Sequence, residues 1–412
     1  MINSTKLAHS EATGKDSCGV LFLKKPAGIE NPVEWYSFKI AGVPFALRNL
    51  LIFQKVNIND LAIFMEDPEG DLEKSFDKIL KDSRISKNIV WMSNITQLKE
   101  WIKNNPNQVY IFNGSVLHEK KKLNALIHSL PINENEPPTA FSVNPENLEK
   151  LLFNAQRHPE LSDKTEFSEK PQTGFPIYVQ GSKEREIHKP EDFKTLNEAL
   201  VKGSGLHHDS LVTRTFSRPA SRLLTRMFLN LPISPNQITF ISFFLGLASA
   251  FYFLRGSYWT SVIAALLLVI STWVDGADGE IARLKFMETE IGKKLDIYCD
   301  NIIHFLVFTA IGFGIYHNTG ESIYLYLGGL AGLGGLMAFF LLSPVLLEKR
   351  SQIFHVSDPD LAEKFANRDF IHFLFLVALI DQLEIFILVA AIGANLFFGY
   401  LAYSRLHKLK TA

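Results

Sequence analysis

The sequence predicts an α-helical polytopic membrane domain with six transmembrane helices, preceded by an N-terminal soluble α/β domain. Three observations lead to this fold class. Residues 1 to about 210 are mixed and polar, whereas residues from about 236 onward are mostly apolar with polar breaks. The apolar half divides into six stretches, most of them close to the roughly 20 residues that cross a bilayer. The polar half alternates apolar strand-like runs with helical segments, which is typical of an α/β sheet.

In the polar half, the expected elements follow one another along the chain. The candidate strands are residues 19–23, 61–65, 89–92 and 109–112, and the candidate helices are 46–55, 72–81, 95–104 and 120–129. PINENEPPT, residues 131–139, has the composition of a surface loop. We therefore expect a flexible N-terminus over 1–17, an α/β domain over 18–195, a linker with an interfacial helix over 196–234, and a membrane domain over 235–412.

The six expected membrane spans follow the apolar stretches. They cover about 235–254, 259–274, 296–316, 322–347, 370–380 and 383–403, and the fifth is short unless it begins as early as Phe365. The fourth is rich in glycine (YLGGLAGLGGLMAFF), which permits close helix contacts inside the bundle or in a homodimer; the sequence leaves both open.

Lys and Arg gather at one set of span ends, which sets the expected topology. The opposite loops hold only Arg255. The residues on the basic side are Arg214, Arg218, Arg222, Arg226, Arg283, Lys285, Lys293, Lys294, Lys349, Arg350, Lys364, Arg368, Arg405, Lys408 and Lys410. We therefore expect an integral protein of the cytoplasmic membrane, with both termini and the polar turn after the second span in the cytoplasm.

Four arginines recur every fourth residue before the first span, from Arg214 to Arg226. This spacing predicts a basic stripe on one helix face, suited to the anionic inner leaflet. A solvated linker is the alternative. Pro219 would either interrupt the helix or occupy its first turn.

Four aspartates flank the polar turn between the second and third spans: Asp275, Asp278, Asp296 and Asp300. Spacings of three and four place each pair on one helix face. Carboxylates near a bilayer are costly and usually functional. Two facing pairs would need cations, and an all-oxygen ligand set favours Mg²⁺, Mn²⁺ or Ca²⁺. A solvated acidic turn is the structural alternative.

This stretch reads D-x-x-D-G-x-x-A-R-x8-G-x3-D-x3-D and resembles the signature of the CDP-alcohol phosphotransferase (CDP-alcohol phosphatidyltransferase) family. Every fixed position is present: Asp275, Asp278, Gly279, Ala282, Arg283, Gly292, Asp296 and Asp300. The family's membrane core also has six helices. The resemblance implies transfer of a substituted phosphate from a CDP-linked donor to an alcohol acceptor, with release of CMP, as in phospholipid biosynthesis.

The resemblance also assigns roles to these residues. Two Mg²⁺ or Mn²⁺ ions would be held by Asp275, Asp278 and Asp296, with Asp300 near the second ion as the base. The nucleotide would lie against Gly279, Ala282, Arg283 and Gly292. The donor could be CDP-diacylglycerol or a soluble CDP-alcohol, and the acceptor an alcohol or a phosphorylated alcohol.

Residues outside the signature carry weaker signals. Asn236 and Thr239, in PNQIT, would either lie beside the metal site or cap a helix. His304 continues the face of Asp296 and Asp300, and we expect it to line a cavity rather than bind metal. Lys349, Arg350 and Arg368, with Lys364, would bind an acceptor phosphate or merely reflect the positive-inside bias.

The polar half resembles a sugar-nucleotide or cytidylyl transferase in GVPFALRNLLIFQKVNINDLAIFM and VYIFNGSVLHEK. The whole arrangement resembles the fusion of inositol-phosphate cytidylyltransferase with di-myo-inositol phosphate phosphate synthase. Two departures predict a degenerate, non-catalytic domain. No Gly-rich loop follows the first strand, and Ser115 stands where an acidic metal ligand would follow Asn113 and Gly114.

Bulk properties limit the remaining alternatives. A net charge of −1 gives no global field for nucleic acid, and we expect membrane lipid as the surrounding partner instead. The N-terminus lacks the apolar core of a signal peptide, and Cys18 and Cys299 do not suggest a disulfide. Two rival hypotheses remain: a bifunctional enzyme that also makes its CDP-alcohol from CTP, and a non-enzymatic cation transporter or scaffold.

Overall fold

The computed structural model describes residues 17–348 and 369–411, apart from 27, 30, 68–70, 87, 128–139, 145, 155–174 and 205–212. The chain divides into two compact units, Met1–Ala199 and Leu200–Ala412. We refer to them as the α/β unit and the membrane unit. The boundary expected at 195/196 falls inside helix α8 (Pro190–Lys202), whose last residues belong to the membrane unit.

The α/β unit is built on a six-stranded sheet in the order β5-β4-β1-β6-β8-β7. All neighbouring strands are parallel except β7, which runs antiparallel to β8. The strands are β1 (Ser17–Phe22), β4 (Ile58–Phe64), β5 (Ile89–Met92), β6 (Gln108–Asn113), β7 (Ala140–Ser142) and β8 (Ile177–Val179), and β2 (Lys39–Ile40) and β3 (Val43–Pro44) form a separate hairpin.

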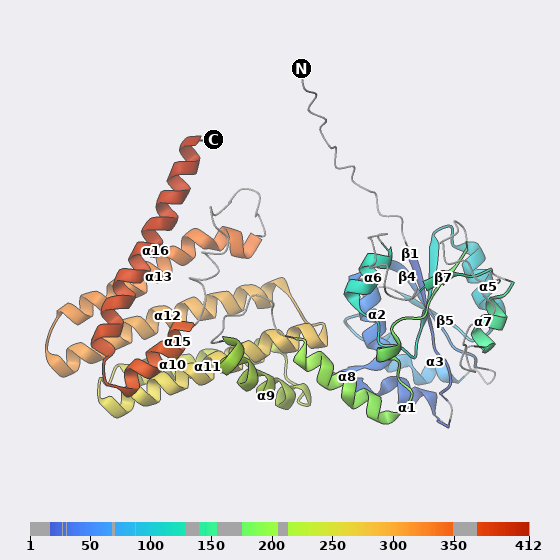
Figure 1. Ribbon diagram of the computed structural model, residues 1–412, viewed down its shortest axis with the longest axis horizontal. Helices are drawn as coiled ribbons and strands as arrows, with labels where there is room; N and C mark the ends of the chain where they lie inside the picture. The colour runs from blue at the N-terminus through green and yellow to red at the C-terminus, as the bar shows by residue number, and fades with distance from the viewer. Residues whose placement is uncertain are drawn as a thin grey trace, which may run out of the picture. The chain divides into compact units, whose positions relative to one another are not determined.

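Helices cover both faces of this sheet (Figure 1), with α2 and α6 on one side and α5 and α7 on the other. The central strands therefore consist of continuous apolar runs, and every residue of β1 is buried. The helices are α1 (Pro32–Ser37), α2 (Phe45–Lys55), α3 (Leu72–Ser75), α4 (Asp77–Leu80), α5 (Ile95–Asn104), α6 (Lys120–Ile127) and α7 (Leu148–Asn154).

All four strands expected from the sequence are present, and so are the four expected helices, one of them divided into α3 and α4. The sequence prediction missed α1, α7, β2, β3, β7 and β8. Each of these elements is only two to seven residues long, which is too short for a hydrophobic period to stand out. It also missed α8, which has 13 residues.

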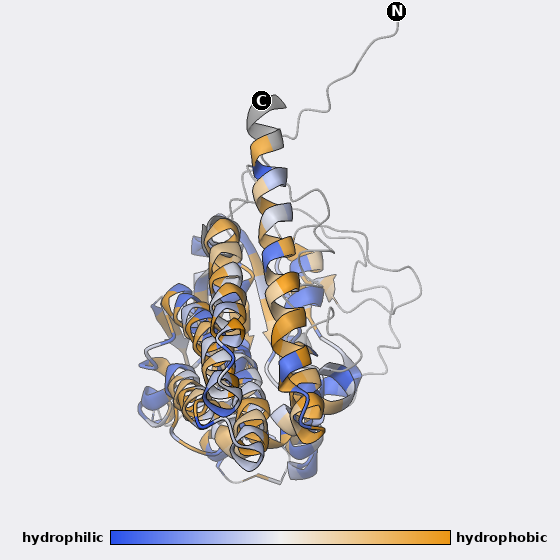
Figure 2. Ribbon diagram, turned by 90° about the vertical axis from the view of Figure 1, so that its left-hand side faces the viewer, coloured by the Kyte–Doolittle hydropathy of each residue, from blue (hydrophilic) through white to orange (hydrophobic). Residues whose placement is uncertain are grey.

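The membrane unit is a helical bundle rich in hydrophobic residues (Figure 2). Many of its large apolar side chains are exposed, among them Phe244, Trp259 and Leu396. In the described residues, five helices are long and apolar enough to cross a membrane. They are α10 (Pro235–Phe253), α11 (Tyr258–Lys285), α12 (Glu290–Thr319), α13 (Ile323–Glu348) and α16 (Leu383–Thr411). Helix α15 (Asp369–Leu379) is apolar, and 11 of its residues fall in the part of the chain that the structure describes. The prediction of six spans is therefore confirmed for five, because 11 helical residues extend about 16 Å and the hydrocarbon core is about 30 Å thick.

The bundle packs through close helix contacts at glycine. A Cβ atom added at Gly312 of α12 would lie 2.4 Å from the Tyr324 carbonyl oxygen and 2.8 Å from Cα of Gly328, both on α13. One added at Gly314 would lie 2.1 Å from the Phe253 carbonyl oxygen at the end of α10. Small residues let the backbones approach, which holds α12 against both neighbours.

Helix α9 (Arg218–Leu229) precedes the first span and follows a short π-helical turn, Thr213–Ser217. Pro219 occupies its first turn, as one of the two alternatives predicted. The predicted stripe of four arginines on one face is wrong. Arg214 and Arg226 are exposed, but Arg218 is only 8% exposed and pairs with Glu280 of α11. A four-residue spacing turns by about 40° at each step, or about 120° over the four arginines, so the row crosses from the exposed surface to the face of α9 that packs on α11.

Candidate active site

The four aspartates lie on a hairpin of two long helices, with Asp275 and Asp278 on α11 and Asp296 and Asp300 on α12. The hairpin turn is short. Helix α11 ends at Phe286, whose φ of 57° is left-handed, and Thr289 caps α12 by accepting a hydrogen bond from the Gly292 amide. The two helices therefore bring their acidic residues together at the same end of the bundle.

Three of the aspartates form a compact group. One carboxylate oxygen from each of Asp275, Asp278 and Asp296 lies within 4.8 Å of the other two. Asp275 and Asp278 are each 7% exposed. Ligand oxygens on one Mg²⁺ or Ca²⁺ ion lie up to roughly 4 to 5 Å apart, so these residues fit a divalent cation. Asp300 is not in this group, and it lines the cavity that adjoins it.

Hydroxyl groups of α10 hold the α11 carboxylates from behind. The Thr239 hydroxyl donates a short hydrogen bond to Oδ2 of Asp278, and the Ser242 hydroxyl lies 3.4 Å from Oδ1 of Asp275. Ser271 in turn donates to the Ser242 carbonyl at 2.7 Å. Thr239 is thus placed beside the acidic group, and the N-cap of α10 is Ser234. The sequence reasoning missed Ser242, although it follows Thr239 by three residues on the same helix face.

A small cavity leads from the carboxylates into the bundle between α10, α11, α12 and α15. Its polar lining includes Asp275, Cys299, Asp300 and His304. The His304 ring contacts Phe370 edge to face, with ring centroids 5.2 Å apart. His304 therefore lies where we expected it, at the cavity wall, and outside the three-carboxylate group.

Arg283 lies next to the acidic pair on the last turns of α11. Its Nη2 donates to the Ser204 carbonyl at 3.1 Å, and its Nη1 would lie 3.2 Å from a Cβ atom added at Gly279. Gly279 therefore leaves room for the guanidinium. Within the part of the chain that the structure describes, the buried Nε of Arg283 has no hydrogen-bond partner.

The remaining predicted residues occupy different positions. A Cβ atom added at Gly292 would lie 2.8 Å from Oδ1 of Asn236, so the start of α12 packs closely on the start of α10. Ala282 is partly buried on α11. The basic residues proposed for an acceptor phosphate, Lys349, Arg350 and Arg368, lie outside the described residues, as does Lys364.

The family pattern of CDP-alcohol phosphatidyltransferases matches residues 232–401. This range includes all eight signature positions and every helix that carries them. The C-terminal half of the chain is a CDP-alcohol phosphatidyltransferase domain. The resemblance noted in the sequence is thereby confirmed. The three grouped carboxylates are three of the four aspartates in the stretch that carries this resemblance.

Three curated relatives are each named "Bifunctional IPC transferase and DIPP synthase". The protein from Archaeoglobus fulgidus is 34% identical over 138 residues, which is 32% of this chain and 26% of the relative. Those from Aquifex aeolicus and Thermococcus kodakarensis are 27% and 29% identical, over 42% and 40% of this chain and 39% and 36% of the relatives. The chain thus spans well under half the length of each of these three relatives. Their names are compatible with the expected cytidylyltransferase-like fusion.

The α/β unit has the topology of a ligand-binding sheet, and backbone groups at the usual ligand position make hydrogen bonds within the protein. The strand order changes direction between β1 and β6, where such sheets bind ligands beyond the strand ends. There the Gly114 amide donates to the Phe22 carbonyl at 2.7 Å. The buried Tyr36 hydroxyl accepts from the Lys24 amide and donates to the Lys24 carbonyl. The amides of Gly114 and Lys24 are therefore already bonded within the protein.

Proposed function

We propose that the chain is an integral-membrane transferase. It moves a substituted phosphate from a CDP-linked alcohol to an alcohol or phosphorylated-alcohol acceptor and releases CMP. The grouping of Asp275, Asp278 and Asp296 within a domain of the CDP-alcohol phosphatidyltransferase family is the observation that supports this most strongly. Arg283 adds a positive charge for the pyrophosphate on the same helix as Asp275 and Asp278.

The acidic residues would hold two divalent cations, Mg²⁺ or Mn²⁺, with Asp300 contributing to the second. When bound, such ions neutralise the pyrophosphate and stabilise the leaving CMP. Thr239 keeps the carboxylate of Asp278 turned toward the site through its hydrogen bond. The Ser242 hydroxyl donates to the Thr239 carbonyl at 2.8 Å and lies 3.4 Å from the carboxylate of Asp275. Carboxylates held in this way need no reorganisation when the donor binds.

The reaction needs one proton transfer and one displacement at phosphorus. The acceptor hydroxyl oxygen bonds to the phosphorus on the alcohol side of the donor, and the bond from that phosphorus to the CMP oxygen breaks. Asp300 takes the hydroxyl proton, because it lines the cavity next to the three grouped carboxylates. Arg283 binds the pyrophosphate, and Gly279, Ala282 and Gly292 line the nucleotide position.

The proposed site faces the cytoplasm, on the side where the Lys and Arg residues gather. The surrounding partner is membrane lipid, and Lys349, Arg350 and Arg368 are the proposed ligands of an acceptor phosphate. A Cβ atom added at Gly393 or Gly399 of α16 would meet no described atom within 4 Å, so a second copy of the chain could pack closely at these positions.

The test is CMP release by purified protein in detergent, screened over CDP-diacylglycerol, soluble CDP-alcohols and polyol or polyol-phosphate acceptors. We expect release with at least one pair, dependent on Mg²⁺ or Mn²⁺ and abolished in Asp300→Asn. Glu384→Gln is the control, because this carboxylate bonds to Tyr324 beyond the far end of α12. No release with any pair, or full activity in Asp300→Asn, would contradict the proposal.

A second candidate function is a bifunctional enzyme that also makes its donor from CTP. The names of the relatives favour it, whereas the hydrogen bonds of Tyr36 and Gly114 favour a non-catalytic α/β unit. We propose that the α/β unit is not catalytic. Incubation of the intact protein with CTP and inositol phosphate should then give no pyrophosphate, and pyrophosphate release at a rate matching CMP production would establish the bifunctional alternative.

A further inference from the structure

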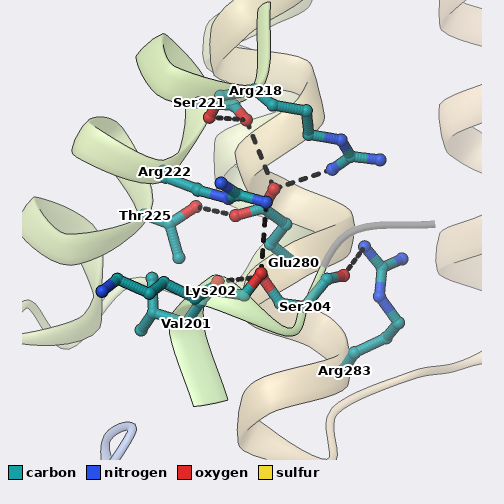
Figure 3. Close-up of polar contacts among 9 residues, drawn as sticks. All are labelled: Val201, Lys202, Ser204, Arg218, Ser221, Arg222, Thr225, Glu280 and Arg283. Carbon is teal, nitrogen blue, oxygen red and sulfur yellow. Dashed lines mark hydrogen bonds and ion pairs between the residues drawn. The ribbon is translucent and has the colours of Figure 1, made fainter. Parts of the chain in front are cut away.

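Glu280 lies inside the signature, between Asp278 and Arg283, yet it is not part of the acidic group. Its side chain is fully buried. Its carboxylate accepts three hydrogen bonds from side chains of α9 (Figure 3). Oε1 accepts from Nη1 of Arg218 at 2.7 Å and from the Ser221 hydroxyl at 3.3 Å. Oε2 accepts from the Thr225 hydroxyl at 2.8 Å. Glu280 therefore binds α9, whereas Asp275 and Asp278 contact α10. The two helices lie on opposite sides of α11.

The three donors stand at positions 218, 221 and 225, which form one face of α9. The opposite face exposes Leu223 and Met227, each 59% exposed. A buried carboxylate with a charged partner and two hydroxyl donors is bound strongly, because low dielectric strengthens each hydrogen bond. Glu280 is thus the polar anchor that fixes α9 on α11.

Helix α9 in turn fixes the end of α8, close to Arg283 (Figure 3). Nη2 of Arg222 donates to the Lys202 carbonyl at 3.1 Å, and Nη2 of Arg283 donates to the Ser204 carbonyl at 3.1 Å. Two guanidinium groups therefore meet the carbonyl end of one helix, where cations are favoured. The position of the Arg283 side chain depends on where α9 holds this helix end.

We propose that Glu280 is a positioning residue for Arg283 in binding the donor's pyrophosphate. This inference rests on the proposed function. Glu280 fixes the position of α9 through Arg218, Ser221 and Thr225. Helix α9 in turn fixes the end of α8, and the Ser204 carbonyl after this end orients the Arg283 guanidinium beside Gly279. Glu280 touches neither donor nor metal. Its loss weakens donor binding and leaves the chemical step itself intact.

The test compares donor KM and kcat for CMP release in four variants, together with thermal stabilisation by CMP plus Mn²⁺. Glu280→Gln and Thr225→Val remove the anchor without a large change of shape. We expect each to raise donor KM on the order of tenfold while kcat stays within about twofold, because binding shared by the ground and transition states is lost. Thr225→Ser restores the hydroxyl donor and should restore KM.

Ser249→Ala is the matched control, because the Ser249 hydroxyl is buried on α10 and donates to the Ala264 carbonyl of α11 at 2.7 Å. It should lower thermal stability without changing KM. An unchanged KM in Glu280→Gln and Thr225→Val, or an equal rise in Ser249→Ala, would overturn the inference. If the wild-type protein shows neither CMP release nor stabilisation by CMP plus Mn²⁺, the proposed function itself fails, which is a different result.

Discussion

Thr239 and Ser242 place hydroxyl groups against the acidic pair of α11. A carboxylate that binds a cation with one oxygen keeps further lone pairs, and partners on these fix its orientation. Groups of this kind commonly change metal affinity or activity by about 10- to 100-fold when removed. The hydroxyl groups of Thr239 and Ser242 therefore belong to the site, although we do not propose either as a ligand of the metal.

We predict that Thr239→Val weakens activation by the metal. The substitution keeps the shape of the side chain but removes its donor to Asp278, so the Mn²⁺ concentration for half-maximal CMP release should rise by about tenfold or more. Ser249→Ala removes a buried hydroxyl of the same helix and should leave this concentration unchanged. An identical Mn²⁺ dependence in Thr239→Val and wild type would refute the role given to Thr239.

His118 is a buried histidine of the α/β unit, 4% exposed, with its Nε2 3.0 Å from the Asn113 carbonyl and its ring against Phe53 and Phe112. Burial lowers the pKa of His118 from 6.5 to about 4, and the Asn113 carbonyl opposes this shift in part. The imidazole is thus neutral in the folded protein at neutral pH.

We therefore predict that the α/β unit loses stability in mild acid. Between pH 6.5 and about 4 the unfolded chain binds a proton at His118 that the folded unit does not. The free energy of unfolding should fall by about 1.4 kcal/mol per pH unit in this window, roughly 3 kcal/mol in all. Hydrogen exchange of β1 and β6 amides in the intact protein, corrected for intrinsic rates, measures this fall. A fall of the same size in His118→Gln would exclude His118 as its cause.

Helix contacts in the membrane unit depend on glycine at particular positions rather than on glycine content. Gly312 meets Gly328 and the Tyr324 carbonyl across the α12–α13 contact. Gly329 and Gly335, in the same glycine-rich run, have nothing within 4 Å of an added Cβ atom. The sequence predicted close packing from this run but not which glycines form it, because several helix faces carry glycine.

We predict that Gly312→Ala destabilises the bundle and Gly335→Ala does not. A methyl group at Gly312 would overlap backbone atoms of α13, which cannot move aside as a side chain can. The cost should be about 1 to 3 kcal/mol, measured by unfolding in mixed micelles. Equal stability of the two variants would mean that α12 and α13 do not pack as described.

Most helices and strands could be predicted from the sequence, but the hydrogen-bond partners of their polar residues could not. The strands of the sheet and five of the spans follow from runs of apolar residues, which burial in a sheet or a bilayer imposes directly. The signature gave the three grouped carboxylates. The role of Arg218 could not be read in this way, because spacing along α9 says nothing about Glu280, 62 residues away. Ser242 was missed for the same reason.

On the scale of the whole molecule, the chain joins two units of different character, and the residues of the proposed reaction lie in the membrane unit. Its chemistry depends on one geometrical fact, the approach of α11 and α12 that brings three carboxylates together. If these residues form a metal site that serves a nucleotide, metal and CMP must strengthen each other's binding, because linkage is reciprocal. A cation transporter or scaffold has no such requirement.

Binding of Mn²⁺ to the purified protein, followed by electron paramagnetic resonance with and without CMP, tests this claim most directly. We expect wild-type protein to bind Mn²⁺ and CMP to tighten this binding on the order of tenfold. Binding should be lost in Asp278→Asn and retained in Glu384→Gln. An affinity for Mn²⁺ that does not change when CMP is added, or that is unchanged in Asp278→Asn, would contradict the account.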